Sequence, residues 1–337
     1  MSNRPTHSTQ YSSFPPYFSP SSIATFERCP RKYFFEKMMR LTKELLDDTV
    51  EPCALKFGSC MHAALPHAVD GDLDLAIATF KTDWGEGDGI YNDSKKNSIV
   101  AVRALADFFA KRGPNSTGPY RKLEQTGEVG QDFQGYDNKP VGSDLYETKF
   151  QIDVGATSPT GEPVPVIGKI DLPARSTATG GLVAVDFKTA SQITGTLSKC
   201  FEINHQTHTY GLAMELLYGE ECDGMIFDFI KTIKTAADTL AVQIPINRRN
   251  IQLEIWYYRD MAARLKGYLQ DEFFPQSFSG CSGYANFGTQ WGQCQFMQLC
   301  KMNDFMDGVD LYEQKPERSG QWDPTKTVSL TLDGKKV

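Results

Sequence analysis

Three charged side chains in two apolar segments could together carry out metal-assisted hydrolysis. Asp186 and Lys188 flank Phe187 in the apolar stretch GLVAVDFKTA (residues 181–190), and Asp171 lies fifteen residues before Asp186 in GKIDLPAR. A charge within an apolar strand is costly unless it is paired or binds a metal. Asp186 and Lys188 would share one face of a strand, and Asp171 lies on the strand that most simply pairs with it in antiparallel fashion. Two carboxylates can hold a hard divalent cation, and a lysine can orient a water and offset charge on a phosphate, which is the chemistry of phosphodiester hydrolysis.

The alternative for an isolated Asp-x-Lys tripeptide is a structural ion pair. The rest of the chain favours chemistry, because further pieces occur in order: SPSSIATFERCPRKY from Ser19, Gly58-x3-His62, Gly168-x2-Asp171, Asp186-x-Lys188 and Gln206-x3-Tyr210. Together they resemble the PD-(D/E)XK nuclease superfamily, and within it the RecB and AddB type of exonuclease domain, which includes the CRISPR-associated exonucleases. The resemblance covers about residues 19–300.

The resemblance assigns a role to each matching position. It makes Asp171 and Asp186 ligands of Mg²⁺ or Mn²⁺ and Lys188 the catalytic lysine. It also implies that His62 adds an imidazole to the metal site and that Phe187 lends its backbone carbonyl. The alternative for a lone histidine on a helix is a structural role. Cleavage is expected to depend on a divalent metal, with Lys188 holding the attacking water.

Three other polar residues accompany this core. Gln206 and Tyr210 are one helical turn apart and share a face, which suits contacts to DNA or to the catalytic lysine. Their alternative is a polar cap over the core. Glu147, in YETKF, lies on the strand before Asp171, where relatives often carry an acid, and is a further candidate metal ligand. A surface role for Glu147 is equally open.

A basic segment interleaved with aromatic residues could bind a nucleic-acid strand. It contains Arg28, Arg31, Lys32, Lys37 and Arg40. The alternative is a solvated helix face. The net charge of −7 gives the chain no global attraction to nucleic acid, so binding would depend on such a local patch or on cations held by carboxylates.

Four cysteines form a candidate cofactor site. Cys281, Cys294 and Cys300 lie within twenty residues, and Cys29 is the natural fourth ligand. Thiolates gathered in this way hold iron–sulfur clusters or zinc. The resemblance to the iron–sulfur members of the family implies a structural [4Fe–4S] cluster that staples the ends of the chain, although the gap of twelve residues after Cys281 is longer than in many relatives. Zinc and ordinary buried thiols remain the alternatives. The other four cysteines are expected in the core: Cys53, Cys60, Cys200 and Cys222.

The elements that must position these residues can be read from the hydrophobic pattern. Helical spacing dominates residues 55–112, and Pro30 is expected to split the first helical segment at Cys29. Strand patterns follow in 145–154, 164–175 and 181–189, then a helix over 204–219, strands in 224–232 and 239–246, and a long helix from 251. Residues 314–337 are polar and show no clear pattern. This order predicts an α/β fold. With the resemblance, it predicts a restriction-endonuclease-like mixed central sheet flanked by helices, with a helical lobe and a cysteine-stapled C-terminal segment.

The expected domain plan has five parts along the chain. They are a flexible arm (1–18), an N-terminal helical region carrying Cys29 and His62 (19–140), a nuclease core (141–246), a C-terminal helix with the cluster-binding segment (247–305) and a tail (306–337). No apolar stretch is long enough to cross a bilayer and no signal peptide is evident, so we expect a cytoplasmic protein with reduced thiols.

These features lead to one functional hypothesis and two rivals. The hypothesis is a metal-dependent DNA exonuclease acting on single-stranded or end-containing DNA in replication, recombination or repair. The chain has no Walker motif, so it is not itself a helicase, and a helicase, a recombinase or a single-strand-binding protein is a candidate partner. The rivals are a non-catalytic DNA-binding or adaptor subunit that keeps the fold, and an iron–sulfur electron carrier.

Overall fold

The chain folds into two compact units. The computed structural model describes residues 14–43, 52–123, 145–190, 199, 201–202, 204–232, 237–277, 294–302, 304–314 and 327–332. Unit 1 comprises Met1–Thr49, Phe150–Gly168 and Arg249–Val337, and unit 2 comprises Val50–Lys149 and Lys169–Arg248. Each unit therefore draws on segments that lie far apart in the sequence.

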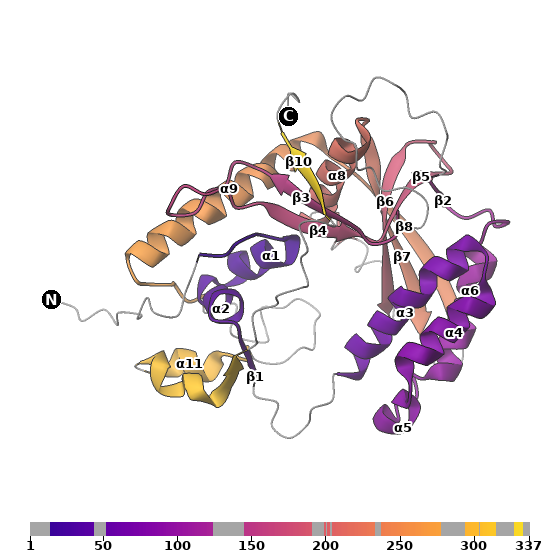
Figure 1. Cartoon of the computed structure of the whole chain (residues 1–337), viewed down its shortest axis with the longest axis horizontal. Coiled ribbons are helices and arrows are strands. Elements are labelled where there is room, and N and C mark those ends of the chain that lie inside the picture. Colours follow the sequence, from indigo (N-terminus) through magenta and orange to yellow (C-terminus); the bar gives the residue numbers. More distant parts are fainter. Residues whose placement is uncertain are drawn as a thin grey trace. The chain divides into compact units, whose positions relative to one another are not determined.

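Unit 2 is built on a five-stranded sheet with the order β2-β5-β6-β7-β8 (Figure 1). The strands are β2 (Tyr120–Lys122), β5 (Leu172–Ser176), β6 (Leu182–Ala190), β7 (Cys222–Thr232) and β8 (Ala237–Pro245). β6 and β7 are parallel, whereas the other neighbours are antiparallel. Parallel neighbours need a crossover connection, and α8 (His205–Tyr218) supplies it between β6 and β7. The predicted mixed α/β sheet flanked by helices is confirmed.

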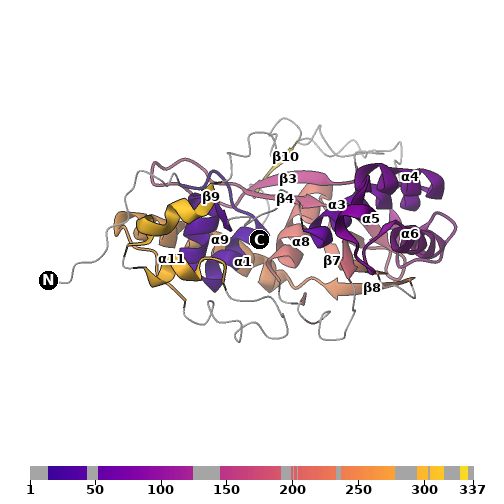
Figure 2. The ribbon, with the colours of Figure 1, turned by 90° about the horizontal axis from the view of Figure 1, so that it is seen from below.

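Four helices form the helical lobe expected between residues 55 and 112 (Figures 1 and 2). They are α3 (Cys53–Asp70), α4 (Leu73–Trp84), α5 (Gly87–Tyr91) and α6 (Ser98–Arg112). The side chains of Asp72 and Asn97 cap α4 and α6 by accepting hydrogen bonds from backbone N–H groups in the first turn. α3 ends at Gly71, whose φ of +101° lies in the left-handed region that glycine adopts without strain.

The two faces of β6 carry different kinds of residue because strand side chains alternate. Val183, Val185 and Phe187 are buried in a core shared with residues of α3, α4 and α6. Asp186 points to the other face, where Gln206 of α8 contacts it. The sheet therefore separates the helical lobe from α8. The charged residues occur within an apolar run because one face of β6 packs in the core while the other face makes polar contacts.

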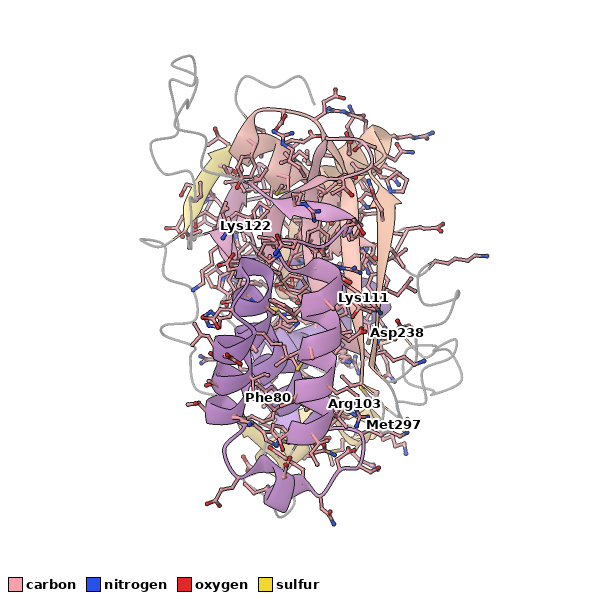
Figure 3. The ribbon with its side chains drawn as sticks, turned by 90° about the vertical axis from the view of Figure 1, so that its right-hand side faces the viewer. Phe80, Arg103, Lys111, Lys122, Asp238 and Met297 are labelled. Atoms are coloured by element: carbon pink, nitrogen blue, oxygen red, sulfur yellow. The ribbon has the colours of Figure 1, made fainter. Side chains whose placement is uncertain are left out.

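An ion-pair clamp joins α6 to the edge strand β8. The Lys111 ammonium lies 3.0 Å from the Asp107 carboxylate on α6 and 2.9 Å from that of Asp238 on β8. Figure 3 shows Lys111 and Asp238 side by side at this edge. The Thr239 hydroxyl also donates to Asp107 at 2.9 Å. These contacts hold the lobe against the last strand.

Unit 1 contains three short helical segments at the N-terminal side and a longer C-terminal helix. They are α1 (Pro20–Arg28), α2 (Pro30–Tyr33), the π-helical η2 (Phe34–Met38) and α9 (Arg248–Gln270). Ser19 caps α1 and Pro30 opens α2, so the helix breaks at Cys29 as the sequence predicts. Further along lie α11 (Met297–Lys301) and the 3-10 helix η5 (Phe305–Leu311). No helix in the described ranges is both long and apolar enough to cross a membrane.

Short strands link distant parts of the chain. β10 (Val328–Thr331) pairs in parallel with β3 (Thr148–Asp153), in a three-stranded sheet of order β10-β3-β4 with β4 (Val166–Ile170). β1 (Leu41–Lys43) pairs antiparallel with β9 (Tyr312–Gln314). The polar C-terminal stretch that had no expected structure thus contributes the edge strand β10.

Candidate active site

The strand register of unit 2 brings the two aspartates together. β5 and β6 pair antiparallel with Leu172 opposite Val185, so Asp171 and Asp186 each stand one position beyond that pair. Asp171 occupies the bend between β4 and β5. Its Oδ2 atom accepts a hydrogen bond of 2.8 Å from the backbone N–H of Phe187. The carboxylate of Asp171 is thereby held next to the part of β6 that contains Asp186 and Lys188.

Asp186 is buried, with 3% of its surface exposed, and has two partners on its own side of the sheet. The Gln206 side-chain amide donates to Oδ1 at 2.6 Å. Oδ2 lies 2.5 Å from the Lys188 ammonium. This contact is an ion pair without hydrogen-bond geometry, since Oδ2 accepts no hydrogen bond from any residue that the structure describes. A buried carboxylate oxygen in this state still has capacity for a cation.

Burial and the neighbouring carboxylate raise the pKa of Asp171. Loss of solvent is the largest cause, the negative charge of Asp186 is the next, and together they raise the pKa to about 7. Lys188, the Phe187 N–H and Lys169 act in the opposite direction. The site therefore holds a proton on a carboxyl group near neutral pH when no cation is bound.

His62 approaches the aspartates from α3. Its Nδ1 atom lies 3.5 Å from Oδ2 of Asp171, and its ring makes an edge contact with Phe187 at 6.4 Å between centroids. Burial, and then the positive charge of Lys188, lower the pKa of His62. A neutral imidazole can bind a metal ion. Gly58, one turn earlier, is close to β6: a Cβ there would lie 3.7 Å from the Thr189 hydroxyl.

Tyr210 also reaches this site from α8. Burial raises its pKa, and the charges of Asp186 and Asp171 add to the effect, while hydrogen bonds with the Gln206 side chain and the Lys169 backbone oppose it. Its hydroxyl therefore stays protonated. The structure brings Gln206 and Tyr210, which the sequence placed on one helix face, to the same carboxylates.

Glu147 lies beside this group with a partner of its own. Its carboxylate is 2.6 Å from the Lys169 ammonium, and its side chain is 50% exposed. Its backbone has a φ of +55° and donates a 3.0 Å hydrogen bond to the Asp171 carbonyl. Phe187 contacts the other residues of the site through its N–H and its ring. The metal-binding roles of Glu147 and of the Phe187 carbonyl stay predictions.

The residues present fit a divalent cation in their chemistry. Two buried carboxylates and a neutral imidazole are oxygen and nitrogen donors of the kind Mg²⁺ and Mn²⁺ accept. Within the described ranges no three His, Cys, Asp or Glu side chains are grouped closely enough to hold a metal as they stand. The Lys188 ammonium, at Oδ2 of Asp186, neutralises one carboxylate in this arrangement. A bound cation would require Lys188 to move away from that oxygen.

The cysteines lie in both units, and the structure describes six of them. Cys29 is buried and its sulfur accepts N–H groups of Lys32 and Ser277, both at 3.4 Å. Burial is the largest cause of the raised pKa of Tyr312, and the nearby Cys294 and Cys300 raise it further. Cys281 and Cys200 lie outside the described residues. Cys60 and Cys222 are buried as expected, whereas Cys53 is only partly buried.

The basic segment of unit 1 is partly engaged in packing. The Arg31 side chain donates from Nε to the Phe274 carbonyl at 2.9 Å and lies over the Phe273 ring. Lys32 and Lys37 both pair with Glu36. The sequence could not indicate the partner of Arg31, which is more than two hundred residues away.

One site residue was missed at the level of sequence. Lys169 lies two residues before Asp171, so Lys169-x-Asp171 mirrors Asp186-x-Lys188. That symmetry is a signal in the sequence, but it gains meaning only in the folded chain, where both lysines lower the pKa of Asp171.

Most of the chain matches one protein family. The model of the PD-(D/E)XK nuclease superfamily matches residues 17–301, and the chain belongs to this superfamily. Among solved structures, a Eubacterium rectale protein provisionally described as an exonuclease is 14% identical, with 90% of this chain and all of that chain covered and a TM-score of 0.40. The structure of SSO0001 is also 14% identical, over 46% of this chain and 59% of that one, with a TM-score of 0.24. None of the curated proteins matches this chain.

Proposed function

We propose that this protein is a metal-dependent deoxyribonuclease that degrades single-stranded or end-containing DNA as an exonuclease. The observation that carries the proposal is the hydrogen bond from Phe187 to Asp171, which sets the second carboxylate beside Asp186 and Lys188. A structural ion pair between Asp186 and Lys188 would need no second buried carboxylate. Membership of the nuclease superfamily supports the same reading.

Each residue has a task in this proposal. Asp171, Asp186 and His62 would hold the cation, with Glu147 and the Phe187 carbonyl as further candidate ligands. When bound, Mg²⁺ or Mn²⁺ supplies Lewis-acid polarisation of a phosphate oxygen and lowers the pKa of a water. Lys188 is positioned to hold the attacking water and to offset charge on the phosphate. Gln206 fixes the orientation of Asp186 through Oδ1, and Tyr210 keeps a protonated hydroxyl beside it.

Labelled DNA tests the proposal. Linear and circular substrates, single- and double-stranded, and matched RNA are incubated with Mg²⁺, with Mn²⁺ and with chelator. We expect cleavage of linear DNA with metal, none with chelator, and loss of cleavage in Asp186→Asn. Asp238→Asn, which changes an exposed aspartate at the far edge strand, is the matched control and should keep activity. A folded wild-type protein that binds DNA without cutting it would favour the adaptor rival.

We also propose that Cys29, Cys281, Cys294 and Cys300 hold a structural [4Fe–4S] cluster, with zinc as the alternative. Support comes from the Cys29 sulfur, which accepts two backbone N–H groups, one of them from Ser277, four residues before Cys281. Phe35 and Phe296 also pack together, with ring centroids 5.5 Å apart. Anaerobic purification should give a protein with visible absorption and iron and sulfide in equal amounts, lost in Cys29→Ser and kept in Cys53→Ser. A colourless protein containing zinc would overturn the cluster and leave the nuclease proposal standing.

The expected partners follow from this activity. A nuclease of this kind would act beside a helicase, a recombinase or a single-strand-binding protein that supplies single-stranded or end-containing DNA. Stimulation of cleavage by unwinding of a blunt duplex would test this expectation.

A further inference from the structure

Lys169 is the second lysine of the site. It lies two residues before Asp171, and its ammonium binds the carboxylate of Glu147, whose backbone N–H donates to the Asp171 carbonyl at 3.0 Å. The ammonium therefore lies beside a residue that would hold the cation, and its charge lowers the pKa of both Asp171 and His62. The backbone N–H of Lys169 donates a hydrogen bond to the Tyr210 hydroxyl oxygen, which fixes the backbone from which its side chain extends. Unlike Asp186, Lys169 is 41% exposed and faces solvent.

The present partner of Lys169 is a weak one. Glu147 binds the ammonium at 2.6 Å, but half of the Glu147 side chain is exposed, and ion pairs in solvent contribute little to stability. Such a pair can open without a large loss of stability. The same ammonium can donate a charge-assisted hydrogen bond to a backbone phosphate oxygen in place of the Glu147 carboxylate.

The backbone of Glu147 is held in a left-handed conformation that a glutamate rarely adopts, with a φ of +55°. Neighbouring contacts fix it: the Tyr146 hydroxyl donates to Asp70 at 2.7 Å, and the Thr148 hydroxyl donates to the Leu145 carbonyl at 2.7 Å. Lys122 adds a 2.6 Å ion pair with Asp70. Strained residues that are fixed in this way concentrate at functional sites.

We propose that Lys169 is a substrate-binding residue that exchanges its contact with Glu147 for a backbone phosphate of the bound nucleic acid. This inference rests on the proposed nuclease function, since it assigns a phosphate contact to the same site. Lys188 acts at the attacked phosphate, whereas Lys169, outside the buried pair, binds a neighbouring phosphate and sets the position of the strand. Glu147 holds the ammonium toward the site until the strand arrives.

Steady-state cleavage of a labelled oligonucleotide across a range of salt concentrations tests this assignment. The matched control for Lys169→Met is Lys111→Met, because Lys111 is 38% exposed and paired with carboxylates but lies on α6 at the β8 edge (Figure 3). We expect Lys169→Met to lower kcat/KM about tenfold, mostly through KM, as loss of a charged hydrogen bond predicts. The slope of log kcat/KM against log salt should shrink by about 0.7, the value for one contact to a single strand. Lys169→Arg should recover most of the loss, and Lys111→Met should match the wild type.

A structural role for Lys169 would leave the salt slope unchanged, so equal slopes in Lys169→Met and Lys111→Met would overturn the proposal. Failure of the nuclease function itself gives a different result. If the wild-type protein binds the oligonucleotide but does not cut it, the same variants are compared by fluorescence anisotropy, and the salt slope of the Kd decides the role of Lys169. A wild-type protein that neither cuts nor binds would overturn both proposals.

Discussion

The backbone N–H of Phe187 donates a 2.8 Å hydrogen bond to Oδ2 of Asp171, across the antiparallel pair β5 and β6. Phe187 thereby connects Asp171 with the strand segment that contains Asp186 and Lys188. Its N–H orients Asp171, its neighbours are Asp186 and Lys188, and its ring contacts His62 and Phe108. The two carboxylates converge because of the register between β5 and β6. That register is fixed by the buried apolar residues on the core face of β6.

Stability of the metal-free protein should fall as the pH rises from about 4 to about 8, because the folded chain keeps a proton on Asp171 that the unfolded chain loses. Below about pH 4 the group is protonated in both the folded and the unfolded chain. Between about pH 4 and its folded pKa of about 7, only the folded chain keeps the proton, so raising the pH favours unfolding. The loss should be on the order of 2–4 kcal/mol and complete above pH 8.

Urea unfolding in chelator, compared with Asp171→Asn, isolates this effect from other titrating groups. The variant should be more stable than the wild type at pH 8 and similar to it at pH 4. Asp238→Asn should show no gain at pH 8, because Lys111 lowers the pKa of that exposed carboxyl. Equal pH dependence of the wild type and Asp171→Asn would show that Asp171 is ionised in the folded protein.

Gln206→Ala should weaken metal use more than substrate binding. The amide fixes Asp186 through Oδ1, and loss of such a supporting contact at a metal site typically costs 10–100-fold in affinity or activity. The Mg²⁺ concentration that gives half-maximal cleavage should rise and kcat should fall, while KM for DNA changes little. An unchanged metal requirement would mean that Gln206 does not orient Asp186.

A buried ion pair at Asp228, which lies opposite Phe187 on the neighbouring strand β7, predicts a large effect of substitution on stability. Arg112 binds the fully buried Asp228 through two hydrogen bonds of 2.6 and 3.0 Å, and the Tyr120 hydroxyl donates to the same carboxylate at 2.8 Å. Arg112→Leu would leave an uncompensated buried charge and should cost about 3–5 kcal/mol in the free energy of unfolding. The double variant Arg112→Leu with Asp228→Leu should recover most of that loss in urea titrations. A double variant no more stable than the single one would contradict this account.

The two glycines of the sequence motifs should respond differently to alanine. A Cβ at Gly168 would lie 2.3 Å from the buried Phe150 ring, so Gly168→Ala should lose about 1–3 kcal/mol of stability through overpacking. At Gly58 the nearest atom is 3.7 Å away, and alanine favours a helix by about 1 kcal/mol. Thermal melting should therefore show Gly58→Ala at or above the wild-type midpoint. A lower midpoint for Gly58→Ala than for Gly168→Ala would reverse this assignment.

Much of the fold and the site could be predicted from local pattern. Alternation in β6 placed Asp186 and Lys188 on one face, and the simplest hairpin pairing placed Asp171 opposite them, as the register shows. The break at Cys29 followed from Pro30. These features depend on residues close in sequence or on one adjacent strand pair.

The rest depends on contacts between distant segments. β10 has four residues and pairs with β3, almost 180 residues earlier, so its own pattern carries little information. The pairing of Arg31 with the Phe274 carbonyl and of Lys169 with Glu147 likewise depends on the folded chain. The left-handed backbone of Glu147 has no signal in its residue type, because glutamate rarely adopts it.

Calorimetric titration with Mn²⁺ at neutral pH tests most directly whether Asp171 and Asp186 bind one ion together. The account predicts one ion per chain at this site, with proton release that is visible on changing the buffer, since cation binding displaces the proton of Asp171. Asp171→Asn and Asp186→Asn should each remove this binding, and Asp238→Asn should keep it. Undiminished Mn²⁺ binding in both site variants would contradict the shared-cation claim.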